Sequence, residues 1–256
     1  MNINKHEKEN WAYSLIHYTG RIMKKINIGD WKKYTFEFLS IFIAVITAFA
    51  LNNWNDNRKA DQSENKILVE ISNGLEKDIE DIRTNKGGHI RGLNACNYFR
   101  DVLVGKEVNS DSLMIQYSAL TRDFISVQNT AGYETLKSRG LELIKNDSLR
   151  LEIIALYEYN YSLLRKLEEE YSEMQFQENY FIEINKILAP HFQFDINKNL
   201  IGINKPLSIQ ADEEKIILLY ILKIRKNREY ILKYYSEIEN KIQQVQKQIL
   251  LEIDNL

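Results

Sequence analysis

Apolar residues recur with a helical period along most of this 256-residue chain. Over residues 217–252 they follow alternating spacings of four and three, and nine of the eleven seam positions are apolar. Residues 153–188 carry the same spacing, with eight of eleven seam positions apolar. Such spacing brings these positions onto one face of a helix. The two patterns predict two long helices, joined by a connector that holds Pro190 and Pro206, as an antiparallel coiled-coil-like hairpin.

An earlier apolar stripe predicts another long helix upstream of the hairpin. Its members follow spacings of three and four, as an amphipathic helix requires. Three glycines interrupt its continuation toward Leu103, and each costs about 1 kcal/mol relative to alanine in a helix interior. They indicate either a kink or a close contact with another helix. The stripe comprises Leu68, Ile71, Leu75, Ile79 and Ile82, continuing through Ile90, Leu93 and Cys96, and the glycines are Gly87, Gly88 and Gly92.

Between these long patterns we expect two short helices, over Asp111–Phe124 and Thr130–Arg139. Gly140 follows the second, and glycine is the residue that best adopts a left-handed conformation after a helix. Asn146 can then cap the next helix through its side chain. We interpret this block as a helix stop followed by a helix start. A binding role for its basic residues, Lys137 or Arg139, is the alternative.

Glycine and proline together make up 12 residues of the chain, about 5% against roughly 12% in average proteins. Sandwiches, barrels and doubly wound sheets need far more turn residues than this. The fold class predicted is therefore all-α, with one N-terminal transmembrane helix followed by an elongated helical bundle.

The transmembrane prediction rests on a run of 16 residues, Phe36–Leu51, whose one charged residue is Glu37. Tyr34 and Trp54 frame this run as an interfacial aromatic belt does. A helix over 34–54 spans about 31 Å, enough for a bilayer. Two alternatives stay open: a buried core helix, and a signal sequence cleaved after Ala48-Phe49-Ala50.

Charge is distributed unevenly on the two sides of this segment. Residues 1–35 carry a net charge of +4 and the rest −6. The excess of lysine and arginine before the segment favours a cytoplasmic N-terminus. We therefore divide the chain into a basic cytoplasmic or interfacial tail (1–33), the transmembrane helix (34–54) and an extracytoplasmic helical domain (55–256) of a bacterial inner-membrane protein. Within the tail, the spacing of apolar residues from Trp11 to Ile26 predicts a basic helix on the membrane surface, with a solvated tail as the alternative.

Four polar residues occupy seam positions of the hairpin: Asn160, Glu178, Asn185 and Arg228. Burying such groups without partners costs several kcal/mol, so we expect partners. Folding the hairpin about residue 203 brings Glu178 near Arg228 and makes an ion pair possible. The alternatives are that the charged ends reach solvent, or that the polar residues form a ligand-binding cluster.

No catalytic motif is present: the chain lacks H-E-x-x-H, G-x-S-x-G and a Walker loop. His89 and Cys96 can share a helix face, but two ligands do not complete a zinc site. The other histidines, His6, His17 and His191, provide no nucleophile and base pair. We therefore predict no catalytic, cofactor-binding or metal-binding residues. The near-neutral net charge of −2 gives no basic footprint for nucleic acid.

Two blocks of sequence carry a resemblance to a known family. The first is the run from Glu37 to Trp54, which ends in Leu-Asn-Asn-Trp-Asn at 51–55 and precedes a long acidic helix. The second begins with Thr-Ala-Gly-Tyr-Glu-Thr-Leu-Lys-Ser-Arg-Gly at 130–140 and continues to Arg150. Over roughly residues 15–250 the chain resembles the bacterial domain-of-unknown-function family 6090. It departs from that family's pattern at Phe38–Phe42, which lacks a glycine-rich run, and at Gly132.

The resemblance implies a single-pass membrane protein with a helical extramembrane domain and no assigned activity. We expect an interaction, scaffold or ligand-sensing protein that is not an enzyme. Its expected partners are the lipid bilayer and a protein partner or a second copy of the chain, but not nucleic acid. A membrane-anchored enzyme with an unrecognised site and a helical protein released after Ala50 are the alternatives.

Overall fold

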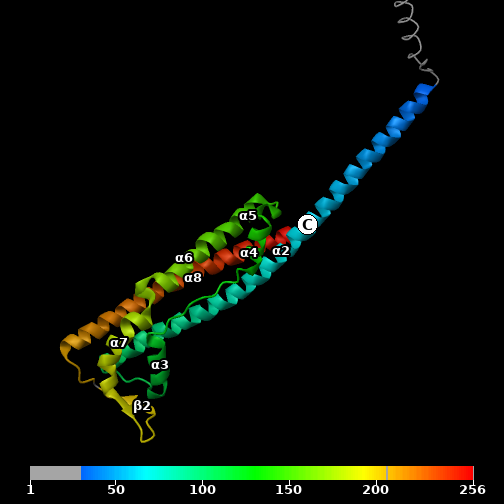
Figure 1. The fold of residues 1–256 in the computed structure, drawn as a ribbon. Helices are drawn as coiled ribbons and strands as arrows, with labels where there is room; N and C mark the ends of the chain where they lie inside the picture. The colour runs from blue at the N-terminus through cyan, green and yellow to red at the C-terminus, as the bar shows by residue number, and fades with distance from the viewer. Residues whose placement is uncertain (1–29, 206, 256) are drawn as a thin grey trace, which may run out of the picture. The chain divides into compact units, whose positions relative to one another are not determined.

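The computed structural model of the chain describes residues 30–205 and 207–255 (Figure 1). The basic helix expected between Trp11 and Ile26 and the connector residue Pro206 lie outside the described residues. The chain divides into two compact units, Met1–Lys59 and Ala60–Leu256. Helix α2 (Trp31–Leu103) contributes residues to both units.

The described part of the first unit is helical, and its residues are exposed up to Lys59. It contains an 18-residue window that is apolar enough to cross a membrane, and 0% of that window is buried. The Thr35 and Ser40 hydroxyls donate to the carbonyl oxygens of Trp31 and Glu37, at 2.8 and 2.9 Å. These polar side chains are thus satisfied within the helix. By length and composition, this part of α2 can span a bilayer.

The second unit contains the rest of α2, the long C-terminal helix α8 (Ala211–Asn255) and shorter helices between them. Helix α8 contacts α5 and α7, and Figure 1 shows α8 running beside the α5 and α6 region. The shorter helices are α3 (Leu113–Leu120), α4 (Ala131–Arg139), α5 (Asp147–Ile154), α6 (Tyr161–Arg165) and α7 (Phe176–Leu188). The 3-10 turns are η2 (Ser110–Ser112), η3 (Leu141–Leu143), η6 (Ser172–Met174) and η7 (Ala189–His191), and the π-helical segments are η4 (Ala155–Asn160) and η5 (Lys166–Glu170).

The helix predicted from the C-terminal seam is confirmed as α8. Every seam position from Ile217 to Ile249 is buried, including Arg228. Intermediate positions such as Lys223 and Lys233 are exposed. One continuous apolar face of α8 therefore forms the centre of the core, as the spacing predicts.

The prediction of one continuous helix over residues 153–188, the other half of the hairpin, is wrong. The segment passes through η4 and η5 and then leaves helical geometry at Tyr171, with φ −76° and ψ 107°. After η6, helix α7 begins a new buried face that repeats every fourth residue, at Phe176, Tyr180, Ile184 and Leu188. A π turn adds a residue to a helical turn and so rotates the face that follows it. Of the seam positions predicted beyond Leu167, Met174 and Leu188 are buried but Tyr171 and Glu178 are exposed, so the seam does not continue as one buried face.

The connector also corrects the all-α prediction. It contains two short antiparallel strands, β1 (Phe192–Phe194) and β2 (Leu200–Ile203), with Phe192 opposite Ile203. The turn between them is held by Asp195, whose carboxylate accepts from the backbone N–H of Asn199 at 2.8 Å. The fold is thus mostly helical with a two-stranded hairpin in the described part of the connector.

The upstream predictions have mixed outcomes. The apolar stripe from Leu68 to Ile82 is buried in α2, but Ile90 is exposed, so the continuation of that stripe is wrong at this position. The helix expected over Asp111–Phe124 ends early, because α3 stops at Leu120. Residues 121–130 form no helix or strand, and we call them the extended segment.

The helix stop and start around residue 140 are confirmed. Helix α4 ends at Arg139, and Gly140 has a φ of +103°, a conformation that favours glycine. The Asn146 side chain accepts from the backbone N–H of Leu149 at 3.2 Å and caps α5. The residues around Gly140 therefore serve the turn between α4 and α5.

Candidate functional site

The extended segment passes along α2 and obtains backbone partners from buried or half-buried carboxylates. Asp78 accepts from the backbone N–H of Asn129 at 2.6 Å, and Asp81 accepts from that of Val127 at 3.0 Å. Backbone groups outside regular structure need such partners when they are removed from water. These two residues of α2 therefore hold the C-terminal half of the extended segment in place.

Glu168 of η5 holds the same segment from the other side. Its carboxylate accepts from the backbone N–H of Ser126 at 3.2 Å, from the Ser126 hydroxyl at 2.9 Å and from the Tyr235 hydroxyl. Glu168 is only 5% exposed, and this burial raises the pKa of its carboxyl group to about 7. Glu168 is thus a buried carboxyl group whose pKa lies well above its usual value and whose two oxygens are occupied by hydrogen bonds to Ser126 and Tyr235.

Asp78 resembles Glu168 in its environment. The Tyr161 hydroxyl donates to its second carboxylate oxygen at 2.6 Å. Burial raises the pKa of Asp78 to about 6, although the hydrogen bonds from Tyr161 and Asn129 partly oppose this shift. The carboxylates of Asp78 and Glu168 each accept hydrogen bonds from a tyrosine hydroxyl and a backbone N–H group, and these hydrogen bonds compensate for their burial.

Arg228 is the largest fully buried side chain in the described residues. Its Nη2 donates to the carbonyl oxygens of Ala119, Leu120 and Arg122, at 3.3, 3.1 and 2.9 Å. Its Nη1 lies 3.1 Å from Nδ1 of His89. These carbonyls belong to the end of α3 and the start of the extended segment. Because the helix stops there, they lack the backbone N–H donors of a following helical turn, and Arg228 donates to them instead.

Two glycines of α2 provide the space for this arrangement. A Cβ on Gly92 would lie 2.3 Å from Nε of Arg228, and one on Gly88 would lie 2.3 Å from the ring of Phe124. The guanidinium of Arg228 lies 4.3 Å from the ring centre of Phe176, within the range of a cation–π interaction. Of the two predicted roles, a kink is wrong because α2 is continuous, and close contact with another helix is confirmed at Gly92, whereas Gly88 contacts the extended segment and Gly87 makes only an ordinary contact.

His89 and Arg228 form a pair in which one member is neutral. Burial, together with the smaller effect of the positive charge of Arg228, lowers the pKa of His89 to about 3. Burial also lowers the pKa of Arg228, to about 10, which still leaves it charged at neutral pH. Neutral His89 can therefore accept a hydrogen bond at Nδ1 from an N–H group of the guanidinium. Its low pKa makes it a poor general base near pH 7.

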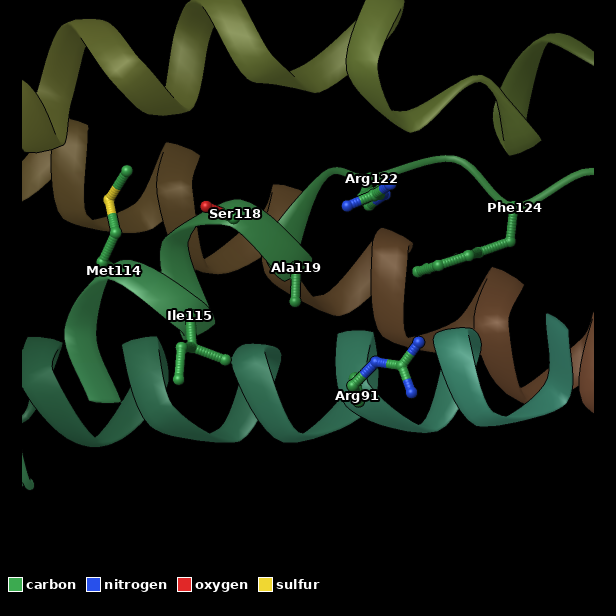
Figure 2. Close-up of a pocket in the computed structure, with 7 residues that line it drawn as sticks. All are labelled: Arg91, Met114, Ile115, Ser118, Ala119, Arg122 and Phe124. Carbon is green, nitrogen blue, oxygen red and sulfur yellow. The ribbon is translucent and has the colours of Figure 1, made fainter. Parts of the chain in front are cut away.

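A groove opens beside this cluster, between α2, α3 and the extended segment (Figure 2). It has a volume of about 280 Å³. The guanidinium carbons of Arg91 and Arg122 each lie 5.9 Å from the ring centre of Phe124. Figure 2 shows the Phe124 ring between the levels of these two arginines. The groove is lined by Arg91, Met114, Ile115, Ser118, Ala119, Arg122 and Phe124.

The predicted ion pair between Glu178 and Arg228 is wrong. Glu178 is exposed on α7, and Arg228 instead binds His89 and three backbone carbonyls. The alternative, in which the charged end of Arg228 reaches solvent, is wrong as well, because its exposed fraction is 0%. The rotation of the buried face at η5 and η6 moves Glu178 out of the interface.

The two asparagines of the predicted seam are half-buried. The Asn185 side chain accepts from the Tyr117 hydroxyl at 2.6 Å, which links α7 to α3. The backbone carbonyl of Asn160 accepts from the Tyr234 hydroxyl at 3.4 Å. Neither asparagine joins the cluster around Arg228, so the four polar seam residues do not form one site.

Lys137 and Arg139 both lie on the surface of α4. Lys137 lies 3.1 Å from Glu158 and 3.6 Å from Glu134, and its ammonium lies 5.5 Å from the ring centre of Tyr133. These contacts connect α4 to η4. They support the structural interpretation of this block.

His89 and Cys96 are both buried in α2, with Cys96 a free cysteine. Burial raises the pKa of the Cys96 thiol to about 11, so the thiolate that a metal requires is disfavoured. No group of three or more metal-binding side chains occurs in residues 30–205 and 207–255.

Sequence reasoning missed Asp78 and Glu168, although both follow helical spacing. Asp78 is three residues after Leu75, and Glu168 is four residues after Leu164, so each continues a buried face. It also missed Phe124, which was placed in a helix. The glycines at 88 and 92 were the available signal for a bulky neighbour.

No family model, no curated protein and no solved structure matches this chain.

Proposed function

We propose that the chain is a single-pass protein of the bacterial inner membrane, with a cytoplasmic N-terminus and its helical domain outside. The observation that carries this proposal is the exposed apolar part of α2, framed by Tyr34 and Trp54. Burying such a surface in lipid gains about 0.3 to 0.6 kcal/mol for each strongly apolar residue. The excess of basic residues before this segment supports the orientation.

We further propose that the domain acts by binding, as a scaffold or ligand sensor, and that it is not an enzyme. Its partner would be another protein, a second copy or a small ligand. The environment of the buried titratable groups supports this proposal, because the carboxylates of Asp78 and Glu168 and the two Nη atoms of Arg228 are occupied by internal hydrogen bonds. The similarity to family 6090 and the coiled-coil character of the α8 face are further parts of this proposal.

Carbonate extraction of membranes from cells that make the full chain tests the anchor. We expect the parent chain to stay in the pellet. Val45→Lys places a charge in the middle of the apolar run, where insertion costs about 2.5 to 3.5 kcal/mol more, and should reduce retention. Asn53→Lys adds the same charge at an exposed polar position and serves as the matched control. Full-length parent chain in the supernatant would overturn the proposal.

Two measurements separate the alternatives. A reporter fused to the C-terminus should be active outside the cytoplasm, and one fused to the N-terminus should be active inside. Intact-mass measurement of the membrane fraction should give the uncut chain. A mass that corresponds to cleavage after Ala50 would favour a released helical protein.

A further inference from the structure

The groove beside Phe124 combines apolar walls with two exposed arginines. Met114 and Ile115 of α3 are 56% and 64% exposed, although both are large and apolar. Arg91 comes from α2 and Arg122 from the extended segment, and both approach the same ring. Figure 2 shows Met114 and Ile115 toward one end of the groove and the two arginines toward the other. The groove therefore has an apolar end and a cationic end.

At the cationic end, the nearby acid Asp123 interacts electrostatically with the buried Arg228. Within residues 30–205 and 207–255, no ion pair involves Arg91 or Arg122. The adjacent acid, Asp123, accepts instead from the backbone N–H groups of Phe176 and Gln177, at 2.7 and 3.3 Å. Behind the groove, the guanidinium of Arg228 lies 5.8 Å from the ring centre of Phe124. Three guanidinium groups thus surround one ring.

The backbone at this place is held firmly. The carbonyl of Arg122 accepts from Arg228 at 2.9 Å, and Phe124 fills the space above Gly88. The guanidinium group of an arginine presents N–H donors in a planar fork that matches the oxygens of a carboxylate or phosphate. The groove volume, about 280 Å³, lies just below the range of roughly 300 to 1,000 Å³ that is usual for ligand pockets, so the groove suits only a small ligand.

We propose that this groove binds a small organic anion. Its carboxylate or phosphate group would lie at the end of the groove formed by Arg91 and Arg122, and its apolar body would pack against Met114 and Ile115. This inference rests on the proposed binding function and names the chemical class of one ligand. The groove joins residues of α2, α3 and the extended segment, so an occupant would link all three.

Calorimetric titration of the full chain in non-ionic detergent micelles tests this proposal with three probes of similar size. Benzoate carries a carboxylate, phenyl phosphate carries a phosphate, and benzyl alcohol is neutral. We expect saturable binding of at least one anion and at least tenfold weaker binding of the alcohol. Comparison of the two anions shows which head group the groove prefers. Raising the salt concentration should weaken anion binding.

Three substitutions locate the binding. Arg91→Gln and Arg122→Gln should each weaken anion binding at least fivefold. Arg165→Gln removes an exposed arginine of α6 that does not line the groove, and it should leave binding unchanged. Far-UV circular dichroism and thermal unfolding of each variant check that the helices are kept.

Several results would overturn the proposal. They are no saturable binding of either anion, equal binding of the neutral alcohol, or equal losses in all three variants. Membrane retention is measured independently of these titrations. Failure of the ligand proposal is therefore distinguishable from failure of the proposed membrane anchor.

Discussion

Helix α8 and residues 153–188 carry nearly the same spacing of apolar side chains, yet only α8 is continuous. The seam of α8 is interrupted by one charged residue within its buried part, Arg228, and that residue has four hydrogen-bond partners. The other seam is interrupted by Asn160, Glu178 and Asn185. A long helix with a regular apolar seam is kept where neighbouring elements provide hydrogen-bond partners for the polar residues in that seam.

The broken segment shows what happens when the predicted seam holds a charge without a partner. Keeping Glu178 buried would cost several kcal/mol. The chain instead passes through η4 and η5, bends at Tyr171 and starts α7 on a new face. This change exposes Glu178 and buries Glu168, which has Ser126 and Tyr235 as donors. With this irregular path, the buried carboxylate of the segment is Glu168, which has hydrogen-bond donors, and Glu178 is exposed to solvent.

The largest expected effect is at the buried charge of α8. Arg228→Ala should lower the free energy of unfolding by about 3 to 5 kcal/mol, because three backbone carbonyls lose their donor and a cavity opens beside Phe176. Arg225→Ala, which removes a partly exposed ion pair with Glu229, should change it by less than about 1 kcal/mol. Urea unfolding of the full chain in detergent, followed by far-UV circular dichroism, measures both. Equal losses would contradict the role given to Arg228.

The next effect concerns the carboxylate buried in the broken segment. The folded pKa of Glu168 is about 7, above its unfolded value of 4.5. Its contribution to stability is therefore full below pH 4.5 and is lost as the pH rises through 7. Glutamine does not titrate, so Glu168→Gln removes this pH-dependent loss of folding stability. The stability of the variant relative to the parent chain should rise by about 2 kcal/mol between pH 5 and pH 8.

The comparison with the parent chain at each pH isolates Glu168 from two other groups. Asp78, with a pKa raised to about 6, acts in the same direction as Glu168. His89, with a pKa lowered to about 3, acts in the opposite direction, because its unfolded form gains a proton as the pH falls below 6.5. A stability difference that does not vary with pH would argue against a raised pKa for Glu168.

A smaller effect tests the close contacts along α2. Gly92→Ala should destabilise the unit by about 1 to 3 kcal/mol, because the new methyl group overlaps the guanidinium of Arg228. Gly87→Ala is the matched control. Its Cβ would lie 3.6 Å from Arg91, an ordinary contact, so the better helix propensity should stabilise by about 0.5 to 1 kcal/mol. Thermal unfolding of the two variants should shift in opposite directions.

The smallest effect is expected at Glu178. Because this side chain is exposed and does not contact Arg228, Glu178→Gln should change the free energy of unfolding by less than about 0.5 kcal/mol. A loss of several kcal/mol in urea unfolding would restore the ion pair that the spacing predicts.

The spacing of apolar residues determined much of this protein by itself. It predicted α8 and its buried face, the buried stripe from Leu68 to Ile82, and α4 with its stop at Gly140. These features depend on residues within a few turns of one another, so local periodicity and the preference of glycine for positive φ suffice. The exposed apolar part of α2 was likewise readable from composition alone.

Tertiary structure decided where each buried polar group found its partner. Arg228 meets carbonyls about 108 residues away, and Glu168 meets Ser126 across 42 residues. No pattern along the chain specifies such contacts, because they depend on which backbone groups lack a helical partner after folding. The same reason explains the groove: the early end of α3 and the glycine at 88 bring Arg91, Arg122 and Phe124 together only in three dimensions.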